Sequence, residues 1–473
     1  MNKMIPVKKG QVLELKIEDL VYGGLGLAKV NGYVIFVDNS VPGQKILAEV
    51  KKTRSDYGKA KLLKVVQQSE IEETPQCKYF YHCGGCKYQN IKYEYQKKFL
   101  KKQIEDIFNK LGNIKRIKIN DIIPSKKIYR YRNKMEFAFS DKRWIADFDK
   151  EKPLNFALGL RAPNNYYKAI DIDDCLIAPE EAQFILKAFR EFALKNNIPC
   201  YNQKTHQGLL RHLVIRKGYM TDEVMINLVI NSIDEKWIDI FRPFVETIKN
   251  GLSNLESFTI SCYTGLAGIV DAEKYYTLFG RDYIHEKIAG LQYKISPLSF
   301  FQTNSETVED LYTVIKNYAD LNGNQIVWDL FSGIGTISLY IADKAKSVFG
   351  FEVRQDSIKY AKLNAKDNGI NNVEFFEVDL SRPSKFFSQI LKEIPSPDVM
   401  ITDPPRSGMS PKLIKEIIKI SPPKIVYVSC KPSTQARDIS LLINEGNYKL
   451  IEIQPVDMFP HTPHVETVAK LEK

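Results

Sequence analysis

The stretch 325–339, QIVWDLFSGIGTISL, decides the fold expected for the C-terminal part of the chain. The apolar run IVWDL predicts a buried strand, the Gly-x-Gly that follows predicts a tight turn, and TISL opens a helical pattern. At such a turn a ligand can approach the backbone closely, at the carboxyl end of a strand. Glu352 ends the next apolar run, SVFGFEV, where a carboxylate can bind the two hydroxyl groups of a ribose. Ser338 stands where a dinucleotide site has its third glycine, so the sequence does not predict a dinucleotide site.

The pattern around this stretch predicts a multidomain chain. Residues 291–473 alternate strand-like runs (VEFFEVDL, DVMITD, KIVYVSC) with helical patterns, which predicts a doubly wound, Rossmann-like α/β domain. Residues 69–290 contain mixed strands such as KMEFAFS, LRHLVIRKG and EVMINLVINS, and they predict a central α+β domain that includes an amphipathic helix over 93–112. Residues 1–68 contain short strands separated by Gly-Gly, Asn-Gly and Pro-Gly turns, which predicts an OB-like β-barrel.

Size and composition agree with this division. A chain of 473 residues predicts two to four domains at roughly 100–200 residues each. Its 44% hydrophobic and 26% charged residues exclude a mainly disordered, collagen-like or coiled-coil chain. No run of about 20 apolar residues occurs, and the first residues lack an apolar signal-peptide core, so we expect no membrane span and a cytoplasmic location.

The charge of the chain is unevenly distributed. Residues 1–134 contain 28 Lys/Arg and 13 Asp/Glu, whereas residues 135–473 contain 40 and 44. The basic N-terminal part predicts a polyanionic partner, because neutralising phosphates releases counterions. Aromatic and basic residues also interleave in KYFYHCGGCKYQNIKYEYQKK and YRYRNK, the composition with which proteins stack unpaired bases and hold phosphates. Nucleic acid is therefore the expected partner.

Three cysteines lie within ten residues, Cys77, Cys83 and Cys86, and Cys175 follows 89 residues later. In a reducing compartment such a cluster predicts a metal site rather than disulfides. Four thiolates can hold either zinc or an iron–sulfur cluster, and the spacing alone does not decide between them.

Two further motifs end predicted strands of the C-terminal domain. Asp403-Pro-Pro-Arg406 follows the run DVMITD, and its fourth residue is not the aromatic residue that amino-methylating enzymes place there. Cys430 ends KIVYVSC above the same ligand crevice, where a cysteine is a candidate nucleophile.

SFFQTN (299–304), the Gly-x-Gly turn, DPPR (403–406), SCKPST (429–434) and MFPHTPHVE (458–466) occur in the order seen in RNA (uracil-5-)-methyltransferases of the RumA/TrmA family, which the chain resembles over nearly its whole length. The run VYGGLGLAKVNGYVIFVD (21–38) resembles a TRAM RNA-binding barrel. The resemblance implies a class I methyltransferase fold and S-adenosylmethionine held by Gln302, Phe331, Glu352 and Asp403. It implies Cys430 as nucleophile and Glu466 as base.

The resemblance also covers the cysteines and the substrate. Similar spacing in cluster-bearing relatives implies a 4Fe–4S cluster on the four cysteines, and the stretch with Arg132 and Lys134 lies near the RNA in relatives. A barrel together with the cysteine cluster resembles the branch of the family that methylates 23S ribosomal RNA, and we expect a monomer. The alternatives are an enzyme for the T-loop uridine of transfer RNA, and an RNA-binding assembly factor with a vestigial methyltransferase fold.

Uracil chemistry agrees with this assignment. Carbon 5 of uracil is a poor nucleophile until a thiolate adds to carbon 6, and a base must afterwards remove the proton from carbon 5. One cysteine and one carboxylate meet that requirement, provided that the target base is unstacked.

Overall fold

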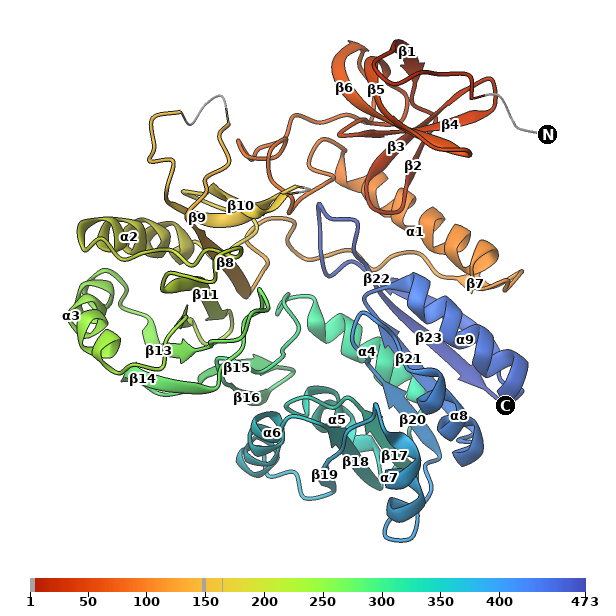
Figure 1. Ribbon diagram of the computed structural model, residues 1–473. Helices are drawn as coiled ribbons and strands as arrows, with labels where there is room; N and C mark the ends of the chain where they lie inside the picture. The colour runs from red at the N-terminus through yellow and green to blue at the C-terminus, as the bar shows by residue number, and fades with distance from the viewer. Residues whose placement is uncertain (1–4, 147–149, 164) are drawn as a thin grey trace.

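The computed structural model describes residues 5–146, 150–163 and 165–473 and arranges them around three large sheets (Figure 1). The first sheet is the N-terminal barrel, with strand order β1-β5-β6-β4-β3-β2. Alternate residues of its strands point inward, as in Tyr33–Asp38, and the apolar ones form a separate core. The strands are β1 (Val12–Lys16), β2 (Asp19–Val21), β3 (Leu25–Val30), β4 (Tyr33–Asp38), β5 (Lys45–Thr53) and β6 (Tyr57–Gln67).

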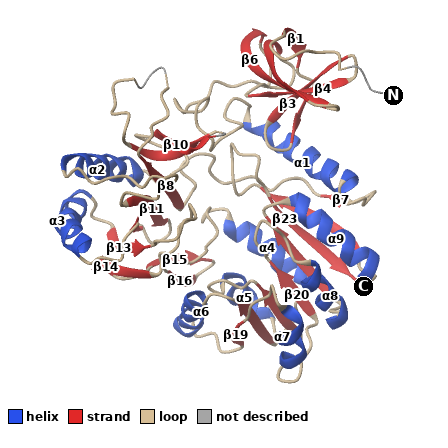
Figure 2. Cartoon of the chain, in the orientation of Figure 1, coloured by secondary structure: helices blue, strands red, loops and turns tan. Residues whose placement is uncertain are grey.

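The second sheet forms the central domain, with order β10-β9-β8-β11-β12-β13-β14. Helices α2 (Glu181–Lys195) and α3 (Lys236–Gly251) cover its apolar face, as Figure 2 shows. On β8 and β11 the opposite face bears polar residues, among them Lys134, Glu136 and Arg216. The strands are β8 (Lys134–Ser140), β9 (Ala157–Ala162), β10 (Asn165–Asp171), β11 (Leu210–Gly218), β12 (Glu223–Ile230), β13 (Leu255–Cys262) and β14 (Lys274–Gly280). A hairpin, β15 (Ile284–Ile288) and β16 (Leu291–Ile295), leads into the next domain.

The third sheet belongs to the C-terminal domain, with order β19-β18-β17-β20-β21-β23-β22-β7. Strand order reverses between β17 and β20, so a crevice for a ligand is expected above their carboxyl ends. The strands are β17 (Ile326–Leu330), β18 (Ser347–Glu352), β19 (Val373–Glu377), β20 (Val399–Thr402), β21 (Lys424–Ser429), β22 (Lys449–Val456) and β23 (Glu466–Glu472). The helices are α4 (Val308–Ala319), α5 (Thr336–Ile341), α6 (Gln355–Asp367), α7 (Pro383–Ile390), α8 (Pro411–Ile420) and α9 (Pro432–Gly446), with a short 3-10 helix, η1 (Ala342–Lys344).

Helix α1 (Tyr93–Lys110) forms where the periodicity predicts it, but it packs outside the central domain. Its buried residues Leu100, Ile104 and Phe108 join the core that contains Ala436 and Ile439 of α9. The strand after it, β7 (Lys118–Ile119), pairs with β22 and extends the third sheet. The orange helix thus lies between the barrel and the C-terminal domain in Figure 1.

No helix in the described part of the chain combines the length and apolar character needed to cross a membrane.

Candidate active site

The turn after β17 has the backbone shape that its glycines permit. Gly333 and Gly335 have φ of +56° and +83°, and Phe331 before them also has a positive φ of +67°. A Cβ on Gly335 would lie 2.6 Å from the Phe375 ring, so only glycine fits there without a shift of that ring. The turn therefore presents open backbone at the sheet's switch point.

Glu352 at the end of β18 fixes one side of this turn. Its Oε2 accepts a hydrogen bond from the Gly333 amide at 3.1 Å, and its Oε1 accepts from the amides of Val353 and Arg354 at 2.9 Å each. Two buried polar atoms beside the turn, Asp329 Oδ1 and Ser332 Oγ, have no hydrogen-bond partner. Because such atoms are costly to leave unpaired, the turn fits a polar ligand such as the ribose and amino-acid groups of S-adenosylmethionine.

Asp403 and Gln302 form the next part of the site. Asp403 follows β20, the strand adjacent to β17, and its Oδ2 accepts a hydrogen bond from Gln302 Nε2 at 3.2 Å. Gln302 is 4% exposed, and its own carbonyl accepts a hydrogen bond from the Asn133 amide at 2.8 Å, which ties this loop to the central domain.

Cys430 and Glu466 lie beside each other at the ends of antiparallel strands. The β21–β23 register pairs Ser429 with Thr467, so Cys430, after Ser429, and Glu466, before Thr467, occupy the next position along the same pair of strands. Glu466 is 3% exposed, and its Oε2 has no hydrogen-bond partner. The fold therefore brings together two residues 36 positions apart in the chain.

Burial of several acidic groups sets the electrostatics of the site. Burial raises the pKa of Asp403 to about 7, and the Asp329 charge adds to the effect while Gln302 opposes it. Burial also raises the pKa of Glu466 well above its usual value, with a further contribution from Asp403. Burial, Glu466 and Asp403 together raise the pKa of the Cys430 thiol to about 11, whereas the positive charge of Arg406 lowers it.

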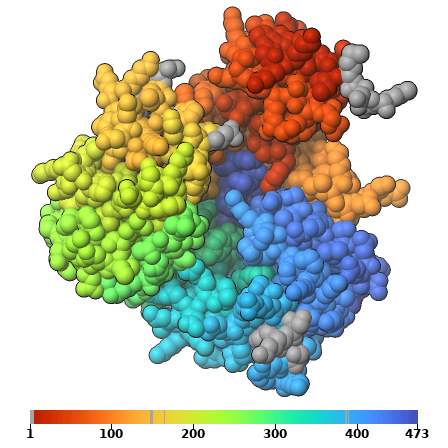
Figure 3. All heavy atoms as spheres, viewed as in Figure 1, coloured from red at the N-terminus to blue at the C-terminus, as the bar shows by residue number. Residues whose placement is uncertain are grey.

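A groove of about 540 Å³ connects this site to the central domain, and its lining includes Arg132, Lys134, Glu136, Arg406 and His464. Figure 3 shows the surface hollowed where the green central part meets the blue C-terminal part. Lys134 Nζ lies 2.7 Å from Glu136 Oε1, so the positive charge of Lys134 is paired within the groove.

Sequence reasoning missed three of these groove residues as site residues. Arg406 was the fourth residue of the Asp-Pro-Pro-Arg motif, and His464 stands two residues before Glu466, so motif position was an available signal for both. Glu136 gave no signal, because only the sheet register places it beside Lys134 on the polar face.

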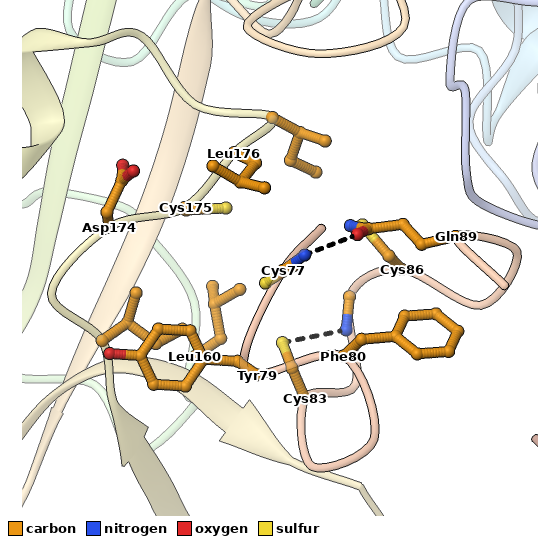
Figure 4. Close-up of a pocket in the computed structure, with 13 residues that line it drawn as sticks. Cys77, Tyr79, Phe80, Cys83, Cys86, Gln89, Leu160, Asp174, Cys175 and Leu176 are labelled. Carbon is orange, nitrogen blue, oxygen red and sulfur yellow. Dashed lines mark hydrogen bonds between the residues drawn. The ribbon is translucent and has the colours of Figure 1, made fainter. Parts of the chain in front are cut away.

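The four predicted cysteine ligands line one pocket, between the loop 77–86 and Cys175 (Figure 4). Its other lining residues are largely apolar, such as Phe80 and Leu160. Within the described ranges, no group of three or more His, Cys, Asp or Glu side chains is arranged to hold a metal ion. The structure thus brings the four thiols to one pocket without arranging them around a single ion. Burial in this pocket raises the pKa of the Cys83 thiol to about 12.

Two family models match separate segments of the chain, and known proteins are similar to it over nearly its whole length. The family model described as tRNA (uracil-5-)-methyltransferase matches residues 219–473, and that of the TRAM domain matches residues 6–63. An RNA methyltransferase of Clostridium tetani is 37% identical over 99% of both chains, and one of Halalkalibacterium halodurans is 34% identical over 100% of this chain and 99% of its own.

A solved structure of similar fold is the tRNA (uracil-54, C5)-methyltransferase of Pyrococcus abyssi in complex with S-adenosyl-L-homocysteine. It is 29% identical, with a TM-score of 0.72 over 97% of this chain and all of that one. The matches support a multidomain protein with an N-terminal TRAM domain and a class I methyltransferase domain. The chain belongs to the tRNA (uracil-5-)-methyltransferase family of S-adenosylmethionine-dependent RNA methyltransferases.

Proposed function

We propose that the protein methylates carbon 5 of a uridine through a covalent adduct between Cys430 and the uracil, with Glu466 as the base. The observation that carries the proposal is the position of these two residues, side by side where β21 ends and β23 begins. A nucleophile and a base that act on adjacent ring carbons, C6 and C5, must be neighbours in this way.

The bonds and protons balance with these two residues. The Cys430 thiol gives its proton to the Asp403 carboxylate, which leaves Glu466 free to act as the base. The Cys430 sulfur bonds to C6, and the C5–C6 π electrons move towards C5 and make it nucleophilic. S-Adenosylmethionine, when bound, supplies the methyl group to C5 and leaves as S-adenosylhomocysteine. Glu466, as a carboxylate, then removes the C5 proton, the double bond forms again, and the C6–S bond breaks to return the thiolate.

The residues around the glycine turn suit this cofactor. Glu352 would bind the ribose hydroxyls, while Gln302 and Asp403 would lie near the reacting end with Phe331 at the turn. Asp329 Oδ1 and Ser332 Oγ, both unpaired, support a polar ligand here. The pKa of Asp403 is raised to about 7 by burial, so a nearby sulfonium cation would favour its charged form.

For the cysteines we propose a 4Fe–4S cluster with a structural role, bound by Cys77, Cys83, Cys86 and Cys175. In such a cluster each thiolate binds a different iron, so the four sulfurs need not converge on one point as they must around zinc. The sulfurs of Cys77, Cys83 and Cys175 face a shared space in Figure 4, and the other residues that line this space are largely apolar.

For the substrate we propose 23S ribosomal RNA, bound with Arg132 and Lys134 near the flipped uridine. The barrel and the cysteine cluster together support this choice through the resemblance given above. The likeness to the Pyrococcus abyssi enzyme favours transfer RNA as a second candidate. Mapping 5-methyluridine in ribosomal and transfer RNA of a strain that lacks the gene distinguishes them, because only the true substrate loses the modification.

The catalytic proposal is tested by comparing Cys430→Ala with Glu466→Gln on denaturing gels. Cys430→Ala should bind RNA and cofactor but form no covalent complex. Glu466→Gln should transfer the methyl group and then stall, so RNA-linked protein accumulates. RNA containing 5-fluorouridine should trap the wild type in the same form. An adduct that persists in Cys430→Ala would mean that another residue is the nucleophile.

A further inference from the structure

The segment that carries the proposed base is anchored by residues outside the C-terminal sheet. This segment, residues 457–465, joins β22 to β23 and is called the base loop below; Glu466 follows it directly. Its first residue, Asp457, accepts a hydrogen bond from the Tyr93 hydroxyl at 2.8 Å, and the Pro460 carbonyl accepts one from the Tyr131 hydroxyl at 3.1 Å. Both partners lie outside the C-terminal sheet.

His461 makes the densest set of these contacts. Its carbonyl oxygen accepts hydrogen bonds from the amides of Lys87 at 2.7 Å and Tyr88 at 3.0 Å, and its ring lies 4.5 Å from the Tyr129 ring. It is 2% exposed and has a φ of +66°, a backbone conformation that few residues other than glycine adopt. A residue held in this conformation needs support from its surroundings, and here the support comes from the chain beside Cys86.

Gln96 of α1 completes the connection. Its side-chain Oε1 accepts a hydrogen bond from the His461 amide at 3.1 Å, and its Nε2 lies 3.1 Å from His461 Nδ1. The same Nε2 donates to the carbonyls of Tyr88 at 3.0 Å and Ile91 at 2.7 Å. One amide that is 1% exposed therefore joins the base loop, α1 and the chain that leaves the cysteine loop.

We propose that His461 is a positioning residue, which couples the cysteine loop, residues 77–86, to the placement of Glu466. Lys87 and Tyr88 follow Cys86 directly in the chain. The hydrogen bonds from their amides to the His461 carbonyl therefore depend on the conformation of the cysteine loop. The inference rests on the proposed roles of Cys430 and Glu466. It gives the cysteine cluster a specific effect on one step of the reaction.

That step is the removal of the C5 proton. Cys430 is placed by β21, a strand between β20 and β23, and does not depend on the base loop. Glu466 begins β23 at the end of the base loop, so a loosened loop misplaces the base more than the nucleophile. Misplaced general bases lose rate steeply with small shifts, so elimination should slow while adduct formation continues. The adduct should then accumulate.

Two buried glutamines of α1 provide a matched test. Gln96→Leu removes the link to His461, whereas Gln103→Leu removes hydrogen bonds from Gln103 to the Leu20 carbonyl and the Tyr88 hydroxyl, at the barrel side of the same helix. Both side chains are buried, so both variants should lose some stability. Only Gln96→Leu should raise the steady-state amount of RNA-linked protein, by about tenfold, with the affinity for S-adenosylmethionine unchanged.

Variants at His461 and hydrogen exchange extend the test. His461→Gly keeps the left-handed backbone but loses the imidazole, and should accumulate adduct as Gln96→Leu does; His461→Asn, which tolerates the same φ, should restore part of the turnover. Cys86→Ser should speed amide exchange at Lys87, Tyr88 and the base loop, whatever the activity.

Two results would overturn the coupling. One is equal adduct levels in Gln96→Leu, His461→Gly and Gln103→Leu; the other is unchanged base-loop exchange in Cys86→Ser. The exchange result does not depend on the outcome for Cys430→Ala, which tests the proposed chemistry itself, so failure of the coupling and failure of the chemistry can be told apart.

Discussion

At the scale of single residues, the Cys430 thiol needs help to react near neutral pH. Its pKa of about 11 leaves little thiolate at pH 8, and Arg406 is the neighbouring positive charge that lowers this value. Arg406→Gln should therefore raise the pKa further and slow alkylation of Cys430 by iodoacetamide between pH 7 and 9. We expect a reduction of about threefold to tenfold, the effect of roughly half to one pKa unit. Mass spectrometry of the Cys430 peptide measures it.

The sign of this effect depends on pH. Because thiolate increases as pH rises towards the thiol pKa, wild type and Arg406→Gln should react at similar rates only well above pH 11. Arg382→Gln is a suitable control, since that arginine is 89% exposed and is not among the groups that shift Cys430. If Arg406→Gln reacted as fast as Arg382→Gln at pH 8, Arg406 would not activate the thiol.

Gly335 provides a second prediction for a single residue. Gly335→Ala combines a left-handed backbone with a Cβ 2.6 Å from Phe375, so the free energy of unfolding should fall by about 2–4 kcal/mol. Gly369→Ala has a φ of +65° but open space around its Cβ, and should cost only about 1–2 kcal/mol. Calorimetric titration should show weaker S-adenosylmethionine binding in Gly335→Ala alone. Equal cofactor affinity in both variants would argue against a cofactor site at this turn.

At the scale of elements, the sequence predicted what local pattern determines. Strands β17, β18, β20 and β21 are apolar runs that alternate with helices, a pattern that predicts a parallel sheet. Parallel strands end at the same edge of a sheet, so the sequence also predicted that Asp403 and Cys430, which follow two of these strands, lie at one edge. The neighbouring positions of Cys430 and Glu466 depend on the antiparallel register of β21 and β23, which the periodicity of the sequence does not determine. Helix α1 was predicted as a helix, but an amphipathic pattern does not say which core receives its apolar face.

The cysteine loop is an element whose proposed cofactor can be measured directly. Protein purified without air should contain iron and sulfide in equal amounts, and Cys175→Ser should lose most of both while it still binds S-adenosylmethionine, because the cysteines line a pocket apart from the glycine turn. Cys262→Ser is the matched control, since that buried cysteine does not line the pocket and should leave the iron content unchanged. Stoichiometric zinc without visible charge-transfer absorption would contradict the proposal.

At the scale of the whole molecule, the basic N-terminal part of the chain forms a second groove. It lies between the barrel and the central domain, has a volume of about 700 Å³, and is lined by Lys51, Lys59 and Lys61 with the aromatic rings of Tyr81 and Trp144. It also reaches Cys83, and the groove that leads to Arg406 begins at the neighbouring Gly84. Both grooves thus border the cysteine loop, and an RNA strand that followed both would extend from the barrel to Arg406.

Replacing the three lysines of the barrel groove with glutamine tests this path. Each phosphate contact to single-stranded RNA contributes about 0.7 to the slope of log affinity against log salt, so the loss of three contacts should reduce the slope by about 2. Affinity should fall most at low salt, with S-adenosylmethionine binding unchanged. The control replaces Lys187, Lys195 and Lys249 with glutamine, which changes the net charge by the same amount. These lysines lie on α2 and α3, the helices on the apolar face of the central sheet. Long-range attraction depends on total charge, whereas counterion release depends on direct contact with the RNA. If both triple variants had the same slope of log affinity against log salt, the three barrel lysines would not contact the RNA, and the barrel groove would not be part of its path.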